Sequence, residues 1–196
     1  MRSKSFTLIE LLIVVAIIAI LAAIAVPNFL EAQVRAKVSR AKSDMRSVRV
    51  ALEAYAVDNN HYPDSDITWH TTLLDIPMIT TPIAYLTSIF NDPFPLKPPS
   101  DPSGDPYSGD PRFSNHGKYY RYYNPQRWKE FFPQLDQQGL KWYMMSNGPD
   151  LDNDVHDLDG KIAEDTLNGL NYMYYDPSNG TTSSGDIIVN NVKSAQ

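Results

Sequence analysis

The chain has 196 residues, a formal net charge of −6 at neutral pH and no cysteine. The absence of cysteine excludes a disulfide framework and a thiolate metal site. With 42% hydrophobic and 11% aromatic residues, the composition is that of a folded protein and excludes a wholly disordered chain.

The first predicted element is an apolar segment close to the N-terminus. Residues 11–26 include no charged or strongly polar side chain, and counting from Phe6 adds only Thr7 and Glu10. A helix of about 21 residues at about 1.5 Å each spans roughly 31 Å, which is close to the hydrocarbon thickness of a bilayer. We therefore predict a single membrane helix, with a kink or local unwinding at Pro27.

Glu10 is a carboxylate inside this apolar segment. An isolated carboxylate in a membrane costs roughly 2.5–3.5 kcal/mol on insertion scales, so it needs a partner or a route to water. Snorkelling to the nearby interface is one interpretation, because Glu10 lies close to the start of the helix. Basic residues flank the segment on both sides, so their positions do not orient it.

The stretch KSFTLIELLIVVAIIAILAAIAVPNF resembles the amino-terminal signature of type IV pilins and of the pseudopilins of type II secretion. The resemblance implies a leader at residues 1–5, cleavage by a prepilin peptidase between Ser5 and Phe6, and methylation of the prepilin type. It also implies that Glu10 pairs with the free amine of Phe6, on the same or a neighbouring subunit. The family has Gly before the cut, and Ser5 should fit a pocket built for Gly less well. The sequence leaves open whether Ser5 permits cleavage, slows it or prevents it.

The same resemblance implies a location and partners. The leader would stay in the cytoplasm, and a single pass would anchor the chain in a bacterial inner membrane with its C-terminal domain periplasmic or extracellular. After processing, copies of the chain would assemble into a helical filament. The implied partners are the prepilin peptidase, other pilins or pseudopilins and inner-membrane assembly proteins.

An amphipathic helix is predicted to continue the membrane segment over residues 28–60. Its apolar residues recur at intervals of three and four, which is helical spacing, and basic residues occupy the other face. The apolar stripe could form a coiled-coil seam, but we favour packing on a sheet of its own domain. The turn formers of DNNHYP predict that the helix ends near residues 58–60. The stripe consists of Val34, Val38, Ala41, Met45, Val48, Leu52 and Tyr55.

Residues 61–196 are predicted to form the globular domain. Residues 61–117 are rich in Pro, Asp, Ser and Gly, which indicates irregular loops. Short aromatic runs at 118–124, 141–147 and 170–176 predict three strands. The region from residue 61 holds 18 acidic and 9 basic residues, which opposes nucleic-acid binding and favours an aromatic sheet core. The predicted fold class is α+β and pilin-like: a long membrane-spanning helix packed on a small antiparallel sheet, with a loop-rich C-terminal region.

An acidic loop follows the second predicted strand, and its sequence is SNGPDLDNDVHDLDG. Closely spaced carboxylates suit calcium, which takes six to eight oxygen ligands, although solvated turn carboxylates are an equal alternative. SNGPD and the later SGDIIV resemble the calcium loop of the major pseudopilin, which implies Asp150 and Asp186 as ligands. Asp152 and Asp154 are added on their chemistry alone. The segment 155–183 is longer than the usual family loop.

No sequence motif indicates an enzyme. The chain has no nucleophile elbow, P-loop, dinucleotide fingerprint or zinc spacing, and its four histidines are scattered. We therefore predict a non-enzymatic structural subunit, a pseudopilin resembling the major one of type II secretion. The alternatives are a type IV pilin of a surface filament and a membrane-anchored domain that binds extracellular ligands, although the last gives Glu10 no purpose.

Overall fold

The structure is a computed structural model that describes residues 7–65, 72–95, 118–128, 139–151, 175–176, 178 and 185–191. Within these ranges a long helix is followed by short 3-10 helices and the strands of one sheet. In chain order the elements are α1 (Leu8–Asn59), η1 (Leu73–Asp75), η2 (Pro77–Ile79), β1 (Arg121–Tyr123), η4 (Pro125–Trp128), β2 (Tyr143–Ser146) and β3 (Ile187–Asn190).

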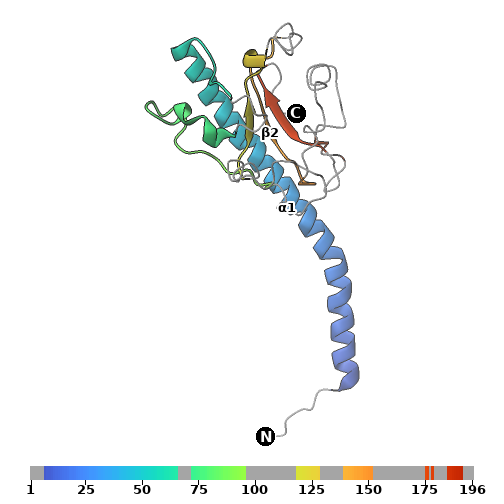
Figure 1. The fold of residues 1–196 in the computed structure, drawn as a ribbon. Coiled ribbons are helices and arrows are strands. Elements are labelled where there is room, and N and C mark those ends of the chain that lie inside the picture. The colour runs from blue at the N-terminus through green and yellow to red at the C-terminus, as the bar shows by residue number, and fades with distance from the viewer. Residues whose placement is uncertain are drawn as a thin grey trace, which may run out of the picture.

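The helix α1 has well-defined ends. Thr7 is the N-cap, with extended backbone, and Asn60 ends the helix in the left-handed region at φ 59°. The end therefore lies where the turn-forming cluster predicts it. The helix continues through Pro27 without a break, so of the two predicted alternatives local unwinding is wrong and a kink stays a prediction. Figure 1 shows a gently curved rod. One missing backbone hydrogen bond does not outweigh the cooperative bonding of the turns on both sides.

The three strands form one antiparallel sheet in the order β1-β2-β3. In its middle row Tyr122 pairs with Met144, which pairs with Val189. Strands β1 and β2 lie inside the predicted segments 118–124 and 141–147, which confirms those two predictions. The small antiparallel sheet of the predicted α+β fold is therefore present.

The third strand lies elsewhere than predicted. Residues 170–174 lie outside the described residues, and Tyr175 and Asp176 are not in a strand. β3 instead comes from the IIVN segment, whose Ile187 and Val189 turn into the core. Three consecutive β-branched residues suit a strand in a sheet that is largely buried on both faces, as the burial of β1 and β2 shows, and this explains why the segment pairs with β2.

The core lies between α1 and the sheet, which confirms sheet packing of the apolar stripe. Figure 1 shows the strands against the C-terminal half of α1, while its N-terminal half projects alone. The helix contributes the predicted stripe, with Val34 only partly buried, and adds Ala51. The predicted sheet-core role of the aromatic residues is also confirmed for the described strands. Around the sheet, the core residues are Tyr120, Tyr122, Trp142, Met144, Ile187 and Val189.

Candidate functional site

The N-terminal half of α1 is an exposed apolar surface. Its large apolar side chains from Leu8 to Leu30 are each between 45% and 78% exposed. Within the part of the chain that the structure describes, α1 is the one helix whose length and composition would allow it to cross a membrane. An apolar surface this large requires lipid or other apolar helices around it.

Glu10 lies in the first turn of this surface and caps its own helix. The backbone N–H and the hydroxyl of Thr7 both donate to Oε2 of Glu10, at 2.8 and 2.7 Å, and Glu10 N–H donates back to Thr7 Oγ1 at 3.2 Å. This reciprocal arrangement is a capping box. Ser5 and Phe6 lie outside the described residues, so cleavage and the pairing of Glu10 with a new amine stay predictions.

The segments that contain Asp150 and Asp186, two of the four predicted calcium ligands, meet at one end of the sheet. Oδ2 of Asp150 accepts a hydrogen bond at 3.2 Å from the backbone N–H of Gly185, the residue just before Asp186. Asp186 is fully buried, and its carbonyl accepts from Tyr175 N–H at 3.0 Å. Asp152 and Asp154 lie outside the described residues.

Gly148 allows the segment around Asp150 and the segment around Gly185 to approach each other closely. Its φ is +70°, and a Cβ there would lie 2.4 Å from the carbonyl oxygen of Gly185. Only glycine permits this approach without a shift of the backbone. The oxygen atoms at this junction belong to carboxylate and carbonyl groups, which are the groups that calcium binds. Among the described residues no three His, Cys, Asp or Glu side chains form a complete metal cluster, so the predicted site stays a prediction.

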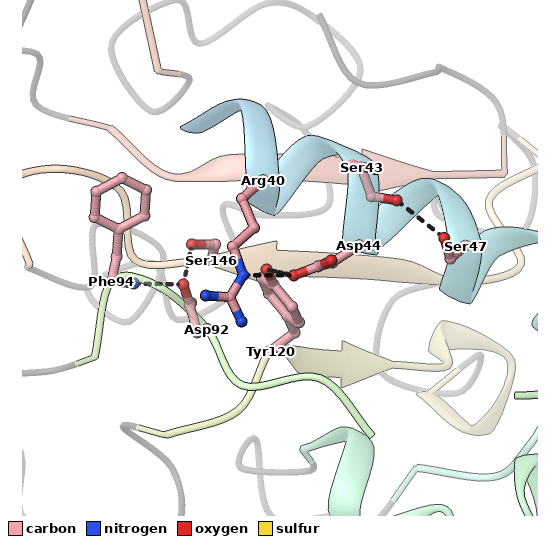
Figure 2. A network of polar contacts seen from close by, with 8 residues as sticks. All are labelled: Arg40, Ser43, Asp44, Ser47, Asp92, Phe94, Tyr120 and Ser146. Atoms are coloured by element: carbon pink, nitrogen blue, oxygen red, sulfur yellow. Dashed lines mark hydrogen bonds and ion pairs between the residues drawn. The ribbon is translucent and has the colours of Figure 1, made fainter. Parts of the chain in front are cut away.

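A buried polar cluster around Asp92 was not predicted as a site. Oδ1 of Asp92 accepts from Ser146 Oγ at 2.7 Å and from Phe94 N–H at 2.8 Å (Figure 2). Burial raises the pKa of this carboxyl to about 6, against the lowering effect of its hydrogen bonds and of Arg121. The NDPF sequence that contains Asp92 gives no chemical signal that separates it from a turn carboxylate.

Two neighbouring contacts connect this cluster to β1 and α1. The buried Arg121 guanidinium donates to Oδ1 of Asn147, whose side-chain amide donates to Phe94 O at 3.1 Å. Beside it, Figure 2 shows Tyr120 reaching α1, where its hydroxyl donates to Asp44 Oδ2 at 3.1 Å. The loop at residues 91–94, β1, β2 and α1 therefore meet in one polar junction inside the domain.

A second polar contact ties the C-terminal half of α1 to the sheet. Tyr62 hydroxyl donates to Oε2 of Glu53 at 2.8 Å, and Trp142 Nε1 donates to Oε1 at 3.2 Å. Burial and the adjacent carboxylate raise the pKa of Tyr62 to about 12. Glu53 is therefore a structural acceptor on both carboxylate oxygens.

The fold is that of a pilin-like protein: a long apolar helix whose second half packs on a small antiparallel sheet. Residues 1–26 match the family model described as the prokaryotic N-terminal methylation motif, and residues 28–122 match the model of type II secretion system protein G. The chain belongs to the family of type IV pilins and type II secretion pseudopilins.

Curated relatives come from both branches of this family. The chain is 31% identical over 106 residues to type II secretion system core protein G of Escherichia coli, covering 54% of this chain and 70% of that protein. It is 49% identical over 63 residues to the type IV major pilin protein PilA of Myxococcus xanthus, covering 32% and 29%. It is 40% identical over 88 residues to the type IV wide pilus major component PilA4 of Thermus thermophilus, covering 45% and 64%. The chain spans under half the length of several relatives, the Myxococcus pilin among them. No solved structure matches the chain.

Proposed function

We propose that the chain is a pseudopilin of a type II secretion system, a filament subunit that polymerises through the N-terminal half of α1 to drive protein secretion. The observation that carries this proposal is the exposed apolar surface from Leu8 to Leu30, which has the carboxylate of Glu10 in its first turn. In a monomer only lipid would cover that surface. In a filament the same side chains would pack against the helices of neighbouring subunits.

The proposal includes a processing step and a location. Cleavage by the prepilin peptidase before Phe6 would create an amine four residues from the capping carboxylate of Glu10. Before assembly the chain would sit in the inner membrane with its C-terminal domain outside the cytoplasm. We infer no enzymatic activity, because the polar clusters of the described residues serve as contacts between elements of the fold.

The substitution Glu10→Gln tests the assembly proposal. It removes the charge that would pair with the Phe6 amine, so we expect cleaved subunits that remain in the membrane and a filament yield at least about tenfold lower, consistent with a lost pair worth 1–2 kcal/mol. Filament yield is measured by shearing and electron microscopy, and processing by mass analysis of the mature N-terminus.

Glu31→Gln is the matched control for that experiment. Glu31 is an exposed carboxylate on the same helix, beyond the apolar surface, and it pairs with Arg35. This variant should assemble as the parent does. Wild-type assembly in the Glu10→Gln variant, or a chain that still starts at Met1 in the presence of the peptidase, would contradict the proposal.

A type IV pilin of a surface filament is the second candidate. It is favoured by the matches to pilins of Myxococcus xanthus and Thermus thermophilus. Deleting the gene separates the two candidates. Loss of exoprotein secretion with surface filaments intact supports a pseudopilin, whereas loss of surface filaments with secretion intact supports a pilin.

We further propose that calcium binds at the junction of Asp150 and Asp186, with Asp152 and Asp154 as further ligands. The support is the approach of Asp150 to Gly185 and the full burial of Asp186, since a buried carboxylate requires compensation by hydrogen bonds or a cation. Bound calcium would close the 147–151 loop onto the start of β3 without a disulfide.

Thermal unfolding with calcium or a chelator tests this site in the full chain in detergent. Calcium at about 100 times its dissociation constant adds about 2.7 kcal/mol, which raises the midpoint by roughly 5–10 °C. Asp186→Asn should abolish this shift, and Asp58→Asn, on the exposed end of α1, should keep it. An equal midpoint with calcium and chelator at neutral pH would contradict the site.

A further inference from the structure

We propose that the buried carboxyl group of Asp92 is a pH-sensitive tie between the loop at residues 91–94 and the end of β2 at Ser146, so that a rise in pH favours opening of this junction. The proposal depends neither on filament assembly nor on calcium. It concerns a group that both of those functions leave unused.

The geometry makes Asp92 the centre of the junction. The residue is only 5% exposed, and one oxygen of its carboxyl group, Oδ1, joins its own loop at Phe94 to β2 at Ser146. Its backbone N–H donates to Lys118 O at 2.9 Å, which fastens the loop to the segment before β1. Opening of the junction therefore means that the Asp92 carboxyl group separates from Ser146 and becomes accessible to water.

The second oxygen, Oδ2, is less well satisfied than Oδ1. It is buried and accepts no hydrogen bond of normal geometry among the described residues, although the backbone N–H of Asn147 lies close enough to the carboxyl group to lower its pKa. A buried oxygen that carries part of a negative charge without a donor is costly, whereas the protonated carboxyl group carries no charge. The closed junction therefore favours the protonated form, and water around an opened loop favours the ionised form.

The surrounding charges do not reverse this preference. Arg121 attracts the ionised form and the hydrogen bonds favour it, but burial outweighs them together. The Lys37 ammonium lies over the Phe94 ring, at 5.9 Å from the centroid. The charged and titratable groups that face the junction are Lys37, Arg40 and Asp44 on α1, Tyr120 before β1, and Arg121 on β1.

The sign of the pH dependence follows from these two states. The Asp92 pKa is about 6 when the junction is closed and returns toward 3.8 when water reaches the carboxyl group. A group with a raised pKa in the closed state stabilises that state at low pH, and the stabilisation is lost as the pH rises through about 6. Between pH 4.5 and 7.5 the opening equilibrium constant should rise roughly 25-fold.

Hydrogen exchange measured by mass spectrometry tests the proposal in the full chain, in detergent and with a chelator present. After correction for intrinsic exchange rates, peptides that contain residues 91–94 and 146–151 should lose protection roughly 25-fold between pH 4.5 and 7.5. Peptides from the buried half of α1 should change much less. Equal protection of the junction at both pH values would overturn the proposal.

Two variants make the assignment to Asp92 specific. Asp92→Asn cannot ionise, so its junction peptides should show protection that is nearly independent of pH. Ser146→Ala removes a donor that favours the ionised form, so it should move the transition upward by about one pH unit. Asp58→Asn is the control and should keep the wild-type profile. A wild-type profile in Asp92→Asn would refute the proposal. If Asp92→Asn does not fold, an unshifted transition in Ser146→Ala would refute it instead.

Discussion

Replacing Leu52 by alanine tests whether the buried face of α1 holds the domain together. Leu52 is fully buried between the helix and the sheet. Leucine to alanine removes three carbon atoms, which is roughly 2.5 kcal/mol of transfer free energy at about 0.8 kcal/mol each. The cavity that remains adds to this, so the free energy of unfolding should fall by about 3–4 kcal/mol.

Thermal unfolding followed by tryptophan fluorescence, to which the buried Trp142 contributes, measures this loss. For a chain of this size each 1 kcal/mol corresponds to about 2–4 °C, so the midpoint should fall by roughly 6–15 °C. Val50→Ala is the matched control, because Val50 lies two residues away and is 69% exposed. It should change stability by less than about 0.5 kcal/mol. Equal losses in the two variants would refute the assignment of core and outer faces on α1.

Three further substitutions test local contacts by the same unfolding measurement. Tyr62 and Trp142 both donate to Glu53, so Glu53→Gln would place an amide donor opposite one of these two donors. The free energy of unfolding should fall by about 1–3 kcal/mol. An unchanged midpoint would show that the Glu53 carboxylate does not accept these hydrogen bonds. The Tyr62 pKa is raised to about 12, so the protonated phenol stabilises the folded chain fully below pH 10, and this stabilisation is lost as the pH rises through 12. Tyr62→Phe should therefore make the midpoint fall less steeply between pH 10 and 12. An unaltered slope would count against the assignment to Tyr62. Gly148→Ala places a Cβ 2.4 Å from Gly185 O at a φ of +70° and should cost about 1–3 kcal/mol or more, whereas a wild-type midpoint would show that the two segments are not in contact.

Periodicity is the reason that so much of the fold can be predicted. The three-four spacing from Val34 to Tyr55 identifies the buried face of α1, because a straight helix brings those side chains to one side whatever covers them. The aromatic runs around β1 and β2 are similarly local signals. Each depends on the chain within a few residues, so no knowledge of tertiary contacts is needed.

The third strand and the Asp92 cluster depend on contacts between distant segments. No local signal in the sequence distinguishes IIVN from other short apolar runs, and its pairing with β2 depends on tertiary packing. Asp92 is likewise one aspartate among many in a loop-rich region. Its burial arises because Phe94 and Ser146, which are far apart in sequence, meet around it.

The two halves of α1 have different requirements, and one continuous helix meets both. Its C-terminal half buries one stripe against the sheet and needs nothing further, whereas its N-terminal half from Leu8 to Leu30 is apolar all round and remains exposed. A helix that is apolar on every side is stable in lipid or among similar helices. Because Glu10 already accepts two hydrogen bonds from Thr7, its carboxylate is held at the helix start before any amine is created there. Under the proposed function, the capping box therefore fixes the position of the charge in the subunit, and cleavage supplies the partner.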